Sequence, residues 1–207
     1  MALIIFDFDG VLADTLGDLL RFGQEACLAL GVARTPTAAD LDALETMSFA
    51  DYGRQLGVPD ELNAEFVRLC LQRFAEKESP PSLFPDLGRV VRALAGVHTL
   101  AIVTGNSTAN VRAFLAEHGL ADCIQQIYGV DMPGSKPQKI ARARQELAQG
   151  GEPVFMIGDS ASDIRAAVES GVQSVAVGWG HQSAKKLAQM NPDRLVSTPA
   201  ELEDQFL

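Results

Sequence analysis

Short apolar runs recur along the chain, and each stops abruptly at polar residues or glycine. They lie at Leu3–Phe6, Thr99–Val103, 124–128, 154–157, 174–177 and Arg194–Val196. The segments between most of them carry apolar side chains every three or four positions, which is the periodicity of a helix. Short strands that alternate with helices of about 10 to 15 residues predict an α/β fold, in which a parallel sheet is covered by helices on both faces.

Residues 16–82 depart from this alternation. Asp14 and Thr15 are typical of a helix start, and apolar side chains then recur at helical spacing as far as Leu30. Further helical patterns follow until Ser79-Pro80-Pro81 interrupts them. We therefore predict an all-α domain at 16–82, inserted into a core made of residues 1–15 and 83–207.

Polar clusters follow the predicted strands at the point where each strand ends. Their members are Asp7 and Asp9, Thr104-Gly105-Asn106, Lys136 in the loop after the weak strand at 124–128, and Asp159 with Asp163. In open α/β sheets, ligands bind just beyond the carboxyl ends of the strands. We therefore expect these side chains to form one site at a single edge of the sheet.

Composition and charge narrow the range of functions. The chain has 207 residues and a formal net charge of −10. Such a charge disfavours nucleic acid and anionic membranes as partners, because both are bound mainly through basic patches. Cys27, Cys70 and Cys123 are odd in number and widely spaced, which fits a reducing compartment. The N-terminal apolar run is too short for a signal peptide, so we expect a cytoplasmic protein.

The residue types at the strand ends suit phosphoryl transfer. A carboxylate such as Asp7 can act as the nucleophile, provided that a cation offsets its repulsion of the incoming phosphate. Mg²⁺ suits this role because it prefers carboxylate oxygens and substrate phosphate, with Asp7 and Asp159 as candidate ligands. Lys136 adds positive charge, Thr104 offers a hydroxyl, and Gly105 and Asn106 offer backbone N–H groups at a helix start.

Four motifs carry a resemblance to a known family: FDFDGVLADT, VTGN, SKP and GDSASD. In this order and at these strand ends they resemble the signatures of the haloacid dehalogenase-like hydrolase superfamily, whose core is a Rossmann-like sheet. Residues 16–82 resemble the small α-helical cap of that superfamily. The tail that begins VGWGHQSAKKL is similar to that of phosphoglycolate phosphatase-like members.

The resemblance implies roles for individual residues. Asp7 would be the nucleophile, and Asp9 the acid that protonates the leaving oxygen and then the base that activates water. Thr104 and Lys136 would bind the phosphoryl group. Asp7, the carbonyl of Asp9 and Asp159 would bind Mg²⁺, and Asp163 would contact metal-bound water or Lys136. An acid at Asp9 favours phosphate esters over carbon–halogen bonds, so the implied substrate is a small phosphorylated metabolite.

Other interpretations remain open for some of these residues. Asp159 could simply cap the following helix, and Asp163 could favour that helix's dipole. Arg54 and Trp179 are candidate substrate contacts, although a solvated arginine and a rim aromatic would look the same. His98, His118 and His181 show no metal-ligand spacing and are interpreted as surface or loop residues.

Two alternative functions also remain open. A mutase of the β-phosphoglucomutase type would share the first motif and the phosphorylated aspartate. A non-catalytic relative that binds a metabolite or a partner protein is the other alternative, although every catalytic position is filled. The sequence identifies no dimer interface.

Overall fold

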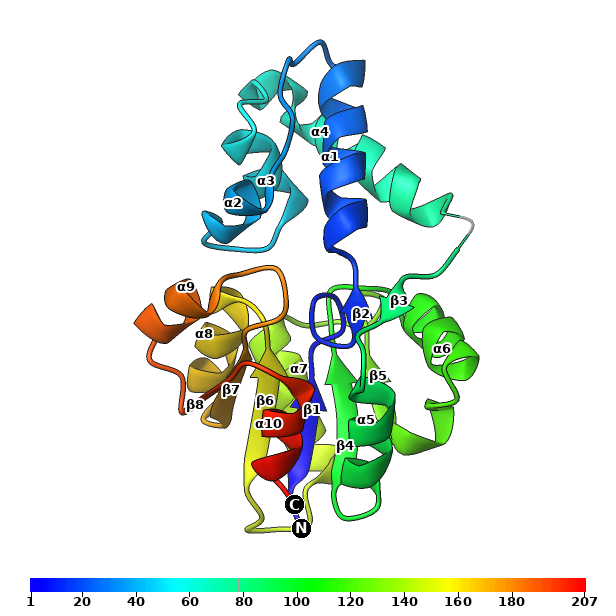
Figure 1. Cartoon of the computed structure of the whole chain (residues 1–207), viewed down its shortest axis with the longest axis vertical. Helices are drawn as coiled ribbons and strands as arrows, with labels where there is room; N and C mark the ends of the chain where they lie inside the picture. The colour runs from blue at the N-terminus through cyan, green and yellow to red at the C-terminus, as the bar shows by residue number, and fades with distance from the viewer. Residues whose placement is uncertain (78) are drawn as a thin grey trace. The chain divides into compact units, whose positions relative to one another are not determined.

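β1 (Leu3–Phe6), whose four residues are all buried, is an inner strand of the main sheet. The computed structural model describes residues 1–77 and 79–207. They form two compact units, one made of Met1–Asp14 with Pro81–Leu207 and the other of Thr15–Pro80. Figure 1 shows the course of the chain through both units.

The first unit is built on a six-stranded parallel sheet in the order β5-β4-β1-β6-β7-β8. Its other strands are β4 (Thr99–Val103), β5 (Gln126–Tyr128), β6 (Val154–Gly158), β7 (Gln173–Val177) and β8 (Arg194–Val196). In the register of the sheet, Phe6 of β1 lies opposite Ile102 of β4 and Ile157 of β6. The carboxyl ends of these three strands therefore lie side by side.

Helices cover both faces of this sheet. They are α5 (Leu87–Ala95), α6 (Thr108–Glu117), α7 (Lys136–Leu147), α8 (Ala161–Ser170), α9 (Ala184–Gln189) and α10 (Pro199–Asp204), with a 3₁₀ turn at Ala121–Cys123. Successive residues of a strand point to opposite faces. Accordingly, Ile4 and Phe6 share a core with α5, α6 and α10, whereas Leu3 and Ile5 share another with α7 and α8. Figure 1 shows α5 and α10 on one side of β1. The predicted fold class is confirmed.

The second unit is helical. It contains α1 (Leu16–Ala29), α2 (Ala38–Asp42), α3 (Phe49–Gln55) and α4 (Asp60–Ala75). These helices enclose a core of their own, in which the buried Tyr52 ring packs edge-on against Phe66. Cys27 and Cys70 are buried in the same core. Helical periodicity predicted this part of the chain because each helix presents an apolar stripe to its neighbours.

Two short strands depart from the sequence prediction. β2 (Ala13–Asp14) and β3 (Ser82–Leu83) pair in antiparallel fashion, with Asp14 opposite Ser82. Asp14 was predicted to begin a helix, but α1 begins at Leu16 with Thr15 as its N-cap. Strands of two residues are too short to produce an alternating pattern, so the sequence could not reveal this pair.

Within the described ranges, no helix combines the length and the apolar character that crossing a membrane requires.

Candidate active site

The sheet has a topological switch point at β1. The chain leads from β1 to β4 and β5 on one side, then returns through α7 to β6, β7 and β8 on the other. Asp7 directly follows β1, and its backbone N–H donates to the carbonyl oxygen of Ile157 at 2.8 Å. Asp159 directly follows β6. The order of the strands therefore places two carboxylates side by side at the edge where such folds bind ligands.

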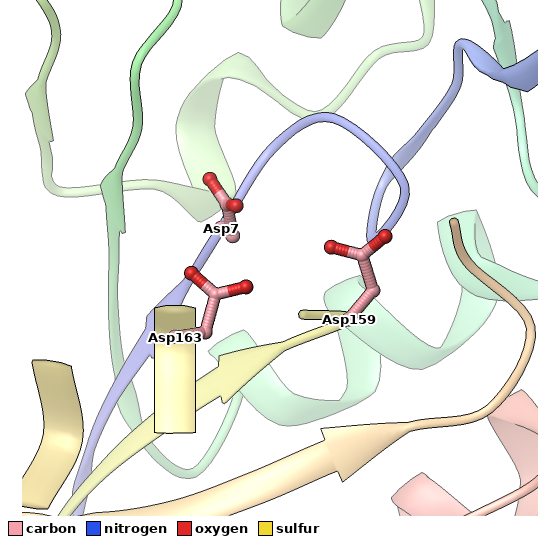
Figure 2. A group of neighbouring side chains, drawn as sticks. All are labelled: Asp7, Asp159 and Asp163. Atoms are coloured by element: carbon pink, nitrogen blue, oxygen red, sulfur yellow. The ribbon is translucent and has the colours of Figure 1, made fainter. Parts of the chain in front are cut away.

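Asp7, Asp159 and Asp163 form an acidic cluster. One carboxylate oxygen from each lies within 4.8 Å of the others, and Asp159 and Asp163 are buried. Figure 2 shows the three side chains converging from the end of β1, the end of β6 and the start of α8. A buried group of carboxylate oxygens is costly without a cation, and this all-oxygen donor set fits a hard divalent ion such as Mg²⁺.

Lys136 joins two members of this cluster. It is the first residue of α7, and its Nζ lies 2.8 Å from Asp7 Oδ2. The same ammonium group forms an ion pair with Asp163 Oδ1. Burial alone would lower the pKa of Lys136, but the charges of Asp163 and Asp7 raise it above its usual value. Lys136 is therefore a permanent cation beside Asp7.

The pKa of Asp7 is raised to about 7. Burial is the main cause, because a carboxylate loses its hydration there. Lys136 opposes the shift, while the negative charges of Asp163 and Asp159 add to it. The other oxygen of Asp7, Oδ1, accepts a hydrogen bond from the Phe8 N–H at 2.8 Å. Without a further cation, this site holds more negative charge than Lys136 neutralises.

Asp163 combines the two roles that the sequence left open. Its Oδ2 accepts hydrogen bonds from the N–H of Ser160 at 3.1 Å and from Ser160 Oγ at 2.6 Å, so it helps to cap α8. Its Oδ1 contacts Lys136. Asp159 does not cap this helix, because Ser160 is the N-cap residue. The interpretation of Asp159 as a helix cap is therefore wrong.

Asp9 lies beside the loop that follows β4. Asn106 Nδ2 donates to Asp9 Oδ2 at 3.1 Å, and the backbone N–H of Asn106 donates to Thr104 Oγ1 at 3.0 Å. Thr104 is buried, whereas Gly105 is exposed. In the described part of the chain, the three-carboxylate cluster does not include the Asp9 side chain. The carboxylates of Asp7 and Asp9 thus have different surroundings.

His181 was interpreted as a surface or loop residue; it does lie in a loop, but it is buried instead of lying at the surface. It follows β7 on the same edge of the sheet, and only 6% of its surface is exposed. Its Nδ1 lies 2.9 Å from Asp159 Oδ2. Burial is the largest single effect and lowers the pKa of His181, but the charge and hydrogen bond of Asp159, together with the charges of Asp9 and Asp7, raise this pKa on balance. The sequence signal that could have identified His181 is its position two residues after Trp179, close to the end of a strand.

The candidate substrate residues make contacts of other kinds. Trp179 Nε1 donates to the carbonyl oxygen of Val11 at 3.1 Å, and its ring packs against the core. In the helical unit, Arg54 Nη2 lies 2.6 Å from Asp51 Oδ1, and the Arg54 side chain is 54% exposed. A role for either residue in substrate binding stays a prediction.

Comparison with known proteins agrees with this arrangement. The family model for haloacid dehalogenase-like hydrolases matches residues 4–177. A phosphoglycolate phosphatase from Vibrio vulnificus is 30% identical, covering 99% of this chain and 96% of that protein. One from Synechococcus elongatus is 28% identical, covering 98% of this chain and 95% of that protein.

A solved structure shares the fold. It is a haloacid dehalogenase-like family hydrolase from Streptococcus pneumoniae, with a TM-score of 0.87 and 23% identity over 100% of this chain and 99% of that one. The chain therefore belongs to the haloacid dehalogenase-like hydrolase family. The resemblance found in the four motifs is confirmed, and so is its most specific part, the likeness to phosphoglycolate phosphatases.

Proposed function

We propose that this protein is a Mg²⁺-dependent phosphatase that hydrolyses the phosphomonoester of a small metabolite through an aspartyl-phosphate on Asp7. The observation that carries the proposal is the contact of Lys136 with both Asp7 and Asp163, beside the acidic cluster. A cation next to a carboxylate at a strand end is what an anionic nucleophile needs in order to approach a phosphate.

In the first step a carboxylate oxygen of Asp7 attacks phosphorus, and the bond from phosphorus to the ester oxygen breaks. The leaving oxygen takes a proton from Asp9 and departs as an alcohol. Lys136 stays beside Asp7 and offsets the negative charge on the transferring group. The amide of Asn106 lies beside the Asp9 carboxylate, so it can orient that proton donor.

In the second step Asp9, now ionised, takes a proton from water, and the oxygen of that water attacks the same phosphorus atom. The bond between phosphorus and Asp7 breaks, releasing inorganic phosphate and restoring the Asp7 carboxylate. The two aspartates thereby divide the work, since Asp7 forms and breaks the covalent bond while Asp9 moves the proton.

Asp7, Asp159 and the backbone carbonyl of Asp9 would hold the Mg²⁺ ion, with Asp163 supporting the site through Lys136. The donor chemistry of the cluster fits such an ion. When bound, the ion would supply Lewis-acid neutralisation of phosphoryl oxygens. The remaining work falls to the residues described above.

The relatives named phosphoglycolate phosphatase, which align over nearly the whole chain, support a small anionic ester as the substrate. The helical unit would act as the cap that selects it, with Arg54 and Trp179 as candidate contacts. The three cysteines are free, which supports a cytoplasmic location.

The test is phosphate release from a panel of small esters, including 2-phosphoglycolate and hexose phosphates, with Mg²⁺ present. Asp7→Asn keeps the size of the side chain but removes the nucleophile, so we expect kcat to fall by about 10³-fold or more. Asp122→Asn is the matched control, because this exposed aspartate lies on the 3₁₀ turn.

Undiminished turnover by Asp7→Asn would contradict the assignment of the nucleophile. Interconversion of hexose phosphates without net phosphate release would instead identify a mutase. An absence of turnover for every ester, together with an absence of Mg²⁺ binding, would favour the non-catalytic alternative.

A further inference from the structure

His181 binds one oxygen of Asp159 twice. The backbone N–H of His181 donates to Asp159 Oδ2 at 2.7 Å, and Nδ1 of the same residue lies 2.9 Å from that oxygen. A carboxylate oxygen accepts hydrogen bonds, so the second contact requires a proton on Nδ1. The loop after β7 thus contacts the residue after β6 through both the backbone and the ring of His181.

Two glycines enclose the same oxygen. A Cβ atom on Gly10 would overlap Asp159 Oδ2 and would lie 2.6 Å from Nδ1 of His181. A Cβ atom on Gly180 would also overlap Asp159 and would lie 2.5 Å from the carbonyl oxygen of Gly10. Backbone therefore packs against this side of the carboxylate, leaving no space there for a cation.

The other oxygen of Asp159 faces the acidic cluster. Figure 2 shows one oxygen pointing toward Asp7 and Asp163, while the second points toward the loop that follows β1. The two oxygens thus have separate surroundings, one packed and hydrogen-bonded and the other directed at the candidate metal site.

We propose that His181 is a positioning residue for metal binding: it fixes the rotation of the Asp159 carboxylate so that the other carboxylate oxygen faces the cation. The inference rests on the proposed Mg²⁺ site and adds a residue to it. A carboxylate held by one hydrogen bond can turn about its terminal torsion, which is a soft one. A second bond to the same oxygen removes that freedom before the cation arrives. Loss of such outer contacts typically weakens metal affinity by about 10- to 100-fold.

The experiment measures binding of Mg²⁺ alone by isothermal titration calorimetry on the full chain. In His181→Leu the side chain fills a similar volume but cannot donate a hydrogen bond to Asp159. We therefore expect the Kd for Mg²⁺ to rise by about 10-fold or more. His181→Asn places an amide nitrogen close to the position of Nδ1, so its Kd should stay within about threefold of the natural protein. His118→Asn, at the far end of α6, controls for loss of an imidazole.

A second readout separates positioning from a structural role. In His181→Leu the Mg²⁺ concentration for half-maximal activity should rise, while kcat at saturating Mg²⁺ should change much less. Should the leucine variant fail to fold, His181→Gln replaces it, because the longer side chain cannot place its nitrogen at the position of Nδ1. The glutamine variant should then bind Mg²⁺ more weakly than the asparagine variant.

Unchanged affinity in His181→Leu would overturn the proposal, and so would equal weakening in the leucine and asparagine variants. Failure of the proposed function looks different, because the natural protein itself would then bind no Mg²⁺. Asp159→Asn provides that reference, since it removes the charge of the ligand itself.

Discussion

At the scale of single residues, the most unusual feature is Asp7, a half-buried carboxylate with two acidic neighbours and one cation. Its pKa is raised from 3.8 to about 7, mainly by burial. In the unfolded chain this carboxyl group ionises near its ordinary value. Between about pH 4 and pH 7 the folded protein therefore keeps a proton that the unfolded chain has released, so metal-free stability falls as the pH rises through this range.

Asp7→Asn removes this titration. In EDTA, the free energy of unfolding of the natural protein should decrease between pH 5 and pH 8. That of the variant should decrease less, and the two decreases should differ by more than about 1 kcal/mol. The measurement is urea unfolding at both pH values. The Asp7 charge also helps to raise the pKa of His181, so the difference between the two proteins reports Asp7 together with this smaller change at His181. Parallel pH dependence in the two proteins would contradict a raised pKa at Asp7.

At the scale of elements, the site is built from strand ends that lead through loops into helix starts. The helices that follow these loops begin on serine N-caps, at Ser107, Ser135, Ser160 and Ser183. A serine hydroxyl satisfies one of the free N–H groups of the first turn. The caps therefore define where each helix starts, and with it the loop that carries the polar residues. Ser107, for example, directly follows Asn106, whose side chain contacts Asp9.

Ser107 offers a direct test of one cap. Its hydroxyl accepts a hydrogen bond from the Asn110 N–H at 3.2 Å. Ser107→Ala should lower the free energy of unfolding by about 1 kcal/mol and the Tm by about 2–4 °C. Ser107→Asp, which is also a good cap, should retain most of the stability. The check is thermal unfolding followed by circular dichroism, and an alanine variant as stable as the natural protein would show that this cap contributes nothing.

The sequence predicted most of these elements but misplaced several of their ends. The strand predicted at 124–128 begins at Gln126, because Ile124 is extended but lies outside the paired strand. Lys136, expected in a loop, is the first residue of α7. Helix starts depend on local capping, whereas the end of a paired strand depends on a neighbour that is distant in the sequence.

At the scale of the whole molecule, the two units have separate hydrophobic cores. The buried clusters of the sheet draw on residues 2–13 and 83–206, and that of the helical unit draws on residues 16–70. The chain leaves and re-enters the sheet unit through the β2–β3 pair, in which Asp14 lies opposite Ser82. Each unit therefore buries its own apolar surface, and the ends of the inserted segment are held together within the sheet unit.

This arrangement predicts that the sheet unit folds without the helical unit. If Asn-Gly replaces residues 15–81, it supplies a two-residue turn of the kind that joins antiparallel strands. We expect the remaining sheet unit to unfold in one cooperative thermal transition, because its clusters keep all their members. Calorimetry tests this by comparing the calorimetric and van't Hoff enthalpies, which should agree. A gradual transition would show that the helical unit is required for folding.

The sequence by itself determined the α/β core, the helical segment and the positions of Asp7, Asp9, Lys136 and Asp159 at its strand ends. It did so because strand and helix periodicity, and the polar residues that interrupt it, are local in the chain. Only the tertiary structure decided which of these residues touch. Asp159 contacts His181 and packs against Gly10. Lys136 forms ion pairs with both Asp7 and Asp163, and Asn106 donates a hydrogen bond to Asp9. These partners are distant in sequence, and the order of the parallel strands brings them to one edge.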